Sequence, residues 1–197
     1  MVLVYFYEQI PFGMKALLLI DIQSGLQETA YYGTERNNPH AEENCAKILR
    51  TFRDKKFPVF HVMHNSTNPA SPLYPGKKGN SIHSSVEPIE GEPVFQKKVN
   101  SAFIGTDLEI ALIAQNITDL VIVGLTLEHC VSTSVRMAAN LGFHVTLISD
   151  ATAAFDKIGF DGKRYPAELI YQTELANLKD EFTLIQNTSS FLTELGN

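Results

Sequence analysis

The sequence predicts an α/β fold: an α/β/α three-layer, Rossmann-like arrangement, with a mostly parallel sheet of about six strands and helices on both of its faces. Short apolar segments alternate along the chain with segments of helical periodicity, and this alternation is typical of a parallel sheet. The run ALLLID, Ala16–Asp21, is apolar at every position before the aspartate, as in a strand that is buried on both faces.

The next predicted elements follow in the order helix, strand, loop, strand. Pro39 precedes a helix over His40–Lys55, where apolar side chains recur at helical spacing. Phe57–Met63 and Val94–Gln96 are predicted strands. Between them, residues 65–93 are rich in Pro, Gly, Ser and Asn. A connection of this length inside a compact domain is either a functional lid or a mobile surface loop, and the sequence leaves both open.

The second half of the chain continues the alternation. Thr106 should cap a helix over residues 107–115, with Glu109 in the position that completes a capping box. The further elements are a strand over Leu120–Gly124, a helix over Cys130–Leu141 that ends at Gly142, a strand over Phe143–Ser149, a helix over Pro166–Lys179, a strand over Phe182–Ile185 and a final short helix.

The length of 197 residues predicts one domain with a sizeable core. We expect residues 14–197 to form it, because MKALLLID, from Met14, has the character of a natural beginning. The preceding residues 1–13 lack the basic start and the small-residue cleavage site of a signal peptide, and Glu8 interrupts them. They are either an upstream extension or an added edge strand.

Composition excludes several classes of protein. The net charge of −6, with no run of Lys or Arg beyond pairs, argues against a nucleic-acid surface. The apolar runs are far shorter than the roughly 18 residues of a membrane-spanning helix. The two cysteines, Cys45 and Cys130, form no disulfide framework and predict free thiols in a reducing compartment. We therefore expect a cytoplasmic protein that binds neither nucleic acid nor membranes.

Three polar residues follow predicted strands: Asp21, Lys97 and Cys130. Because ligand sites of parallel sheets lie at the carboxyl ends of the strands, these residues should converge. Cys130 stands at a helix N-terminus, where N–H groups favour a thiolate and could hold an oxyanion. Asp21 could accept the thiol proton as a general base. Lys97 could orient Asp21, balance its charge and polarise a substrate carbonyl.

Each of the three residues also has a structural explanation. A buried free cysteine is commonly a small apolar filler. An aspartate at a strand end is often a cap or turn residue. Lys97 has Lys98 beside it, and one of the two is expected to be merely solvated. The residues alone therefore leave open whether Cys130 serves packing or chemistry.

Three segments in order, ALLLIDIQSGL, KKVNSAFIGTDLE and VIVGLTLEHCVSTSVRMAANLGF, together with DATAAFD, resemble the isochorismatase-like cysteine hydrolase superfamily. That superfamily includes nicotinamidases and N-carbamoylsarcosine amidase, and the resemblance extends from about Lys15 to about Phe191. It implies an Asp–Lys–Cys triad. The D-x-Q motif places the aspartate at Asp21, the S-A-F motif selects Lys97 rather than Lys98, and the C-V pair places the nucleophile at Cys130.

The resemblance also implies a cis peptide bond between Leu125 and Thr126. Its expected use is to direct the Thr126 N–H, together with that of Cys130, at the oxyanion. Candidate substrate-binding residues are Gln23, Phe103 and His129, and the 65–93 loop is a candidate pocket wall.

No metal and no cofactor are expected. Metal-dependent members of the superfamily carry a D-x-H motif, which does not occur in this sequence. His61 and His64 are three apart on a predicted strand and face opposite sides, so they cannot chelate a metal together. The missing motif argues against nicotinamide as the substrate.

We predict a metal-independent cysteine amidohydrolase that cleaves a C–N bond of a small amide, lactam or ureide through a thioester on Cys130. The resemblance implies a homodimer or homotetramer. One alternative is an isochorismatase-type vinyl-ether hydrolase, which would not need Cys130. The other is an inactive member that serves as an interaction module, which would not need to keep all three triad residues.

Overall fold

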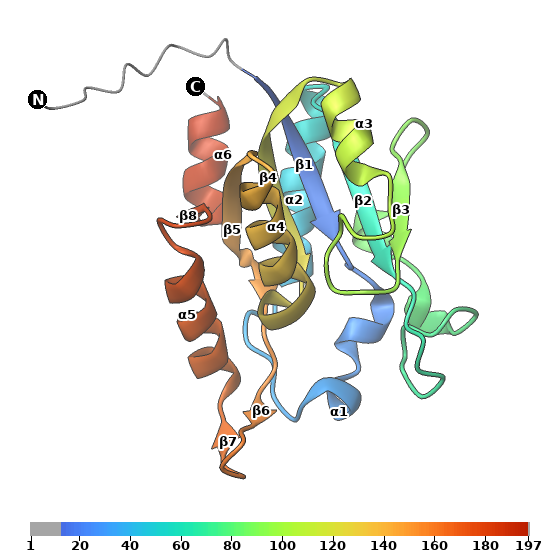
Figure 1. Cartoon of the computed structure of the whole chain (residues 1–197), viewed down its shortest axis with the longest axis vertical. Coiled ribbons are helices and arrows are strands. Elements are labelled where there is room, and N and C mark those ends of the chain that lie inside the picture. Colours follow the sequence, from blue (N-terminus) through green and yellow to red (C-terminus); the bar gives the residue numbers. More distant parts are fainter. Residues whose placement is uncertain (1–12, 197) are drawn as a thin grey trace, which may run out of the picture.

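The computed structural model describes residues 13–196. At its centre six parallel strands lie in the order β3-β2-β1-β4-β5-β8 (Figure 1). The strands are β1 (Met14–Ile20), β2 (Val59–His64), β3 (Val94–Lys97), β4 (Ile117–Leu125), β5 (His144–Ala153) and β8 (Leu184–Gln186). The predicted fold class is thus confirmed. The expected extension over residues 1–13 lies outside the described residues apart from Gly13.

Helices cover both faces of the sheet, because alternate residues of its central strands face opposite layers. Leu18 of β1 belongs to the apolar cluster on one face, and Leu17 belongs to the cluster on the other. In Figure 1, α4 lies in front of the sheet and α2 behind it. The first layer contains α3 (Leu108–Ala114), α4 (Ser132–Asn140) and α5 (Ala167–Leu178), and the second contains α2 (Ala41–Asp54) and α6 (Thr188–Gly196).

Helix α2 follows the predicted pattern closely. Cys45, Ile48, Leu49 and Phe52 are all buried against the sheet, as their helical spacing indicates. The helix ends at Asp54, and Lys56 takes a left-handed backbone conformation with a φ of 58°. That conformation terminates the helix and redirects the chain into β2.

Helix α3 differs from its prediction at the N-terminus. It begins at Leu108, and no side chain caps it from the Asp107 position. The Thr106 hydroxyl donates to the Ala102 carbonyl at 2.6 Å and accepts only a long, 3.5 Å hydrogen bond from the Leu108 N–H. The expected capping box with Glu109 is therefore wrong, because Thr106 lies one residue too far from the helix and is engaged by the preceding turn.

Besides short 3-10 turns at Ser24–Gln27, Lys78–Asn80 and Ser84–Val86, the structure has a helix and a hairpin that were not predicted. The first is the single-turn helix α1 (Thr29–Tyr32), and the second is the hairpin of β6 (Lys157–Ile158) and β7 (Arg164–Tyr165), which projects at the lower end of Figure 1. Asp156 joins them: it accepts hydrogen bonds from the Thr34 N–H at 2.6 Å and from Arg164 at 2.7 Å. Both elements border the carboxyl-terminal edge of the sheet, where the site lies.

The two cysteines are free thiols, and both are buried. Within residues 13–196, no helix combines the length and the apolar character that crossing a bilayer requires.

Candidate active site

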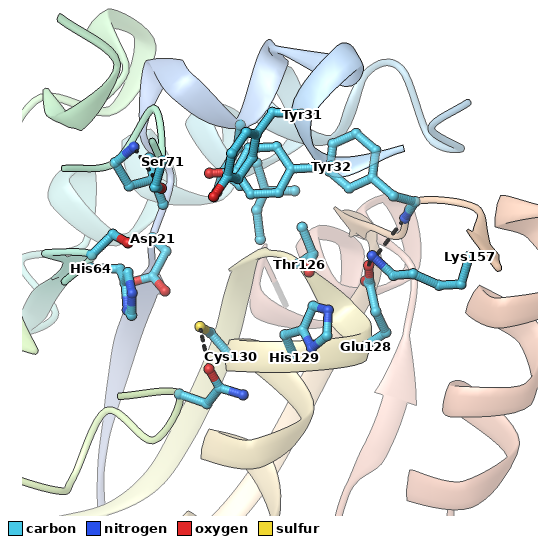
Figure 2. A pocket seen from close by; sticks show the side chains of 16 residues that line it. Asp21, Tyr31, Tyr32, His64, Ser71, Thr126, Glu128, His129, Cys130 and Lys157 are labelled. Carbon is cyan, nitrogen blue, oxygen red and sulfur yellow. Dashed lines mark hydrogen bonds and ion pairs between the residues drawn. The ribbon is translucent and has the colours of Figure 1, made fainter. Parts of the chain in front are cut away.

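A pocket of about 390 Å³ opens at the carboxyl-terminal edge of the sheet (Figure 2). Asp21 follows β1, His64 ends β2, and Cys130 follows β4, so three strand ends supply one end of the pocket. Tyr31 and Tyr32 of α1 lie across from them in Figure 2. The volume is typical of a site for a small molecule.

The three residues predicted to form a triad lie together at this end of the pocket, which Asp21 and Cys130 line. Lys97 Nζ is 2.5 Å from Asp21 Oδ2 and 3.2 Å from Cys130 Sγ. The Lys97 and Asp21 side chains are 0% and 2% exposed. An ion pair this deeply buried is costly to dehydrate, so its position beside a thiol indicates a built site. Lys98, by contrast, is exposed, as expected for one member of the lysine pair.

Close packing of the backbone holds the two sides of this cluster together. Asp21 takes a left-handed conformation with a φ of 51°, which aspartate tolerates better than most residues. Opposite it, Gly124 has a φ of 136°, and a Cβ there would collide with the Ile20 carbonyl oxygen. Glycine therefore allows β4 to approach the end of β1, which brings the segment of Cys130 close to Asp21.

The segment after β4 has an unusual backbone. The Leu125–Thr126 peptide bond is cis, as the resemblance implied. Leu127–Val131 then form one π-helical turn, and the α-helix begins only at Ser132. The predicted helix start at Cys130 is therefore corrected by two residues. Single π-helical turns occur frequently at functional sites, because the extra residue redirects a side chain.

The surroundings of the Cys130 thiol disfavour the thiolate. Burial raises the pKa of the thiol, the negative charge of Asp21 raises it further, and Lys97 opposes both. Helix-terminal stabilisation of a thiolate, expected from the sequence, is outweighed here by loss of solvation, since the side chain is only 8% exposed. A reaction at this thiol thus requires a base, and the Asp21 carboxylate is the neighbouring one.

His64 is a member of the cluster that sequence reasoning missed. Its Nδ1 lies 3.3 Å from Lys97 Nζ. His61 is directed elsewhere, with its Nε2 3.0 Å from Glu92 Oε2, so the two histidines do not converge. The rule that strand ends carry site residues would have identified His64, had β2 been predicted to extend to this residue.

Asp21, His64 and Cys130 offer potential metal-ligand atoms that all lie within 4.8 Å of one another. The Lys97 ammonium lies among these atoms, at 2.5 Å from the carboxylate, 3.3 Å from the imidazole and 3.2 Å from the sulfur. Ammonium and metal ion would compete for the same place. This donor set therefore fits a fixed ammonium better than a metal ion, and a metal-free site stays our prediction.

The three candidate substrate-binding residues have different places. His129 lines the pocket. Phe103 does not: it belongs to the apolar core, where its ring stacks on Phe143 with 6.2 Å between centroids. Gln23 is also not among the lining residues, and its amide instead bonds the backbone of His64 and of Asn80. In this structure Phe103 contributes to packing and Gln23 to the position of His64, and a substrate-binding role of these residues stays a prediction.

The 65–93 loop forms a wall of the pocket. Ser66, Ser71 and Leu73 are among the lining residues. Asn80 ties the loop to the sheet, because its amide donates to the carbonyls of Leu73 and His64 at 2.8 and 3.0 Å. Such a network indicates a fixed wall rather than a loose surface loop.

The end of the pocket away from Asp21 carries Glu128 and Lys157, 3.0 Å apart (Figure 2). Glu128 Oε1 also accepts a hydrogen bond from the Phe155 N–H at 3.2 Å, whereas Oε2 is buried and has no partner among the described residues. Tyr32 stacks on Phe155, and burial raises the Tyr32 pKa to about 12. These residues come from loops with no recognisable motif, so the sequence did not indicate them.

Comparison with known proteins agrees with the geometry. The Isochorismatase domain family model matches residues 15–189. The uncharacterised isochorismatase family protein YrdC of Bacillus subtilis is 43% identical over 180 residues, 91% of this chain and 95% of YrdC. Streptothricin hydrolase of Streptomyces noursei is 31% identical over 73% of this chain and 51% of its own length. A putative hydrolase of the isochorismatase family from Chromobacterium violaceum superposes with a TM-score of 0.89 and 40% identity, covering 93% of this chain and 94% of its own.

Proposed function

The chain belongs to the isochorismatase family of hydrolases, and from that premise we propose that it is a metal-independent cysteine amidohydrolase acting on a small amide, lactam or ureide. One observation carries the proposal: a buried Lys97 ammonium contacts both the Asp21 carboxylate and the Cys130 thiol at the end of a pocket. A nucleophile, a base and a fixed charge are the groups that acyl transfer through a thioester requires.

In the proposed reaction, Asp21 takes the proton from Cys130 Sγ as the sulfur attacks the substrate carbonyl. Lys97 stabilises the negative charge that passes from carboxylate to sulfur. The N–H groups of Thr126 and Cys130 are the proposed donors to the oxyanion. Asp21 then gives its proton to the leaving nitrogen, which departs as an amine or ammonia. A water molecule, deprotonated by Asp21, attacks the acyl carbon, and the bond to Cys130 Sγ breaks. The sulfur takes the proton back from Asp21, and the product is a carboxylic acid, or a carbamic acid where the substrate is a ureide.

The far end of the pocket supports a substrate that carries a further N–H group. The unpartnered Glu128 Oε2 is a buried acceptor, and a buried acceptor without a donor is unfavourable. A substrate with an N–H group beyond its scissile bond would supply the missing donor. A ureide provides such a group on its second nitrogen, whereas a simple amide or lactam carries its N–H on the scissile bond and would need a further N–H elsewhere. The volume of about 390 Å³ limits the substrate to a small molecule.

The two alternative functions leave some of these contacts without a role. A vinyl-ether hydrolase would not need Cys130, yet its sulfur contacts Lys97 and lines the pocket. An interaction module would not need a buried charge pair in an open pocket. A homodimer or homotetramer stays a prediction from the family.

The test is ammonia or amine release from a panel of small amides, lactams and ureides. Cys130→Ala should lose turnover by several orders of magnitude and keep its melting temperature within a few degrees, because removing one sulfur from a core costs only about 1 kcal/mol. Cys45→Ala is the matched control, since Cys45 lies on the opposite face of the sheet and donates to the Ala151 carbonyl. A well-folded Cys130→Ala protein with wild-type turnover would favour the ether hydrolase.

A further inference from the structure

Lys97 has an unusual hydrogen-bonding situation. A lysine ammonium has three N–H donors and no acceptor. The Lys97 side chain is fully buried, so water cannot satisfy any of them. Three atoms lie within reach: Asp21 Oδ2 at 2.5 Å, Cys130 Sγ at 3.2 Å and His64 Nδ1 at 3.3 Å. The number of available acceptors equals the number of donors.

This count decides the state of His64. Because the ammonium can only donate, the ring nitrogen that faces it has to be an unprotonated acceptor. A neutral imidazole has one such nitrogen, so the proton sits on Nε2. A second proton on Nδ1 would remove the acceptor and place two positive charges 3.3 Å apart in a buried site.

The backbone of His64 is held from two directions. The Gln23 side chain accepts from the His64 N–H at 2.8 Å and donates to its carbonyl at 3.1 Å. Asn80 donates to the same carbonyl at 3.0 Å. The Gln23 side chain thus bonds both backbone groups of His64, the last residue of β2. Asp21 and Gln23 are the first and last residues of the D-x-Q motif, so one motif supplies both the proposed base and the residue that holds His64.

We propose that His64 is a positioning residue of this site: in its Nε2-protonated neutral form it accepts the third N–H of Lys97 and so fixes the ammonium between Asp21 and Cys130, while Gln23 and Asn80 hold His64 in place. The hydrogen bonding between His64 and Lys97 does not depend on which reaction the protein catalyses. Only the expected effect on turnover rests on the proposed amidohydrolase function.

The charged groups around His64 agree with a neutral ring. Lys97 on β3, Asp21 after β1 and the Cys130 thiol after β4 face it. Burial is the largest influence and lowers the pKa of His64, and the Lys97 charge lowers it further. Asp21 and a hydrogen bond to the Val99 backbone act in the opposite direction. The histidine therefore gains its proton only below its ordinary range.

The direct test is nitrogen NMR of the histidine rings in the full-length protein, with the His64 signals identified by their loss in His64→Asn. We expect the Nε2-protonated neutral form at pH 7, and a higher His64 pKa in Lys97→Met, because a neighbouring positive charge is removed. A proton on Nδ1 at pH 7, or an unchanged pKa in Lys97→Met, would overturn the proposal. This measurement needs no substrate, so it stands even if amide hydrolysis is not found.

The functional test compares two substitutions. His64→Asn places an amide oxygen near the position of Nδ1 and cannot titrate, whereas His64→Leu offers no acceptor. On an amide found in the panel, we expect kcat/KM to fall by about tenfold to hundredfold in His64→Leu, the effect of a hydrogen bond to a charged group. His64→Asn should stay within a few-fold of the wild type.

The pH profile separates positioning from a merely structural role. Two groups should lower wild-type kcat/KM in acid: His64 as it gains its proton, and Asp21 as the proposed base. His64→Asn removes only the first, so its acid decline should be smaller than that of the wild type. His144→Asn is the control and should keep the wild-type profile. His144 is exposed and begins β5, at the end of the strand that is remote from the site. If His64→Leu does not fold, the profile of His64→Asn decides alone: an unchanged acid decline contradicts the proposal.

Discussion

Lys97 Nζ and Asp21 Oδ2 form an ion pair of 2.5 Å in which both side chains are almost completely removed from solvent. Asp21 Oδ1 is buried without any hydrogen bond to a described residue. The pair thus has one carboxylate oxygen bound by the ammonium and one buried oxygen without a partner among the described residues. In the proposed reaction, this second oxygen would accept the proton of Cys130.

The burial of this pair predicts a strongly non-additive response to mutation. Asp21→Asn or Lys97→Met alone leaves an uncompensated buried charge, and each should lower the free energy of unfolding by about 3–5 kcal/mol. The double variant removes both charges and should be more stable than the sum of the single effects indicates. Urea unfolding at pH 7 measures all four proteins. Simple additivity would show that the two charges do not depend on each other.

The two thiols should differ in reactivity. Cys130 lines the pocket beside Asp21 and Lys97, whereas Cys45 is 0% exposed within the core. Burial raises the pKa of both thiols, so the difference depends on access and on the neighbouring base. Iodoacetamide at pH 7.5 should label Cys130 far faster than Cys45, as followed by peptide mass spectrometry. Equal rates, or faster labelling of Cys45, would argue against an activated Cys130.

Glu128 should determine selectivity. For a ureide that the enzyme hydrolyses, methylation of the distal N–H removes the donor to Glu128 Oε2 and should lower kcat/KM by about tenfold or more. In Glu128→Gln the two substrates should differ much less. Glu174→Gln serves as the control, because Glu174 pairs with Arg136 outside the pocket. The assignment is wrong if Glu128→Gln discriminates the two substrates as strongly as the wild type.

Removal of metals should leave activity unchanged. The reason is the Lys97 ammonium, which lies among the potential ligand atoms of Asp21, His64 and Cys130. Prolonged dialysis against a strong chelator, followed by the ammonia-release assay, checks this. Activity that is lost on dialysis and recovered with zinc or iron would refute the metal-free site.

The lowered pKa of Glu92 predicts that the free energy of unfolding decreases in acid. Burial would raise its pKa, but hydrogen bonds from Arg53, from the Ile89 N–H and from His61 lower it to about 2. Because the folded-state pKa is below the ordinary value of 4.5, this stabilisation is present above about pH 4.5 and is lost as the pH falls toward 2.

Glu92→Gln should therefore be less stable than the wild type at pH 7, and the difference should shrink between pH 4.5 and 2. Urea unfolding at several pH values measures it, with Glu90→Gln as a neighbouring control in the same exposed turn. A difference that stays constant over this pH range would mean that the charge of Glu92 is unimportant.

Much of the fold and of the site could be predicted from local pattern. The apolar run of β1 and the helical spacing of Cys45, Ile48, Leu49 and Phe52 identify their elements, because burial on one face imposes a period on the sequence. Asp21, Lys97 and Cys130 could be named because they lie at or after the ends of strands of a parallel sheet, which meet at one edge, and because they match three ordered motifs.

The tertiary structure alone decided what surrounds these residues. Phe103 belongs to the S-A-F motif, yet it packs in the core, while His64 and Glu128 line the pocket. Gln23 acts on the backbone of His64, 41 residues away. Periodicity records which face of an element is buried, but the direction of a side chain beyond a strand end depends on loops that are distant in sequence. Their packing, and the loss of solvent that comes with it, lower the pKa of His64 and raise the pKa of the Cys130 thiol.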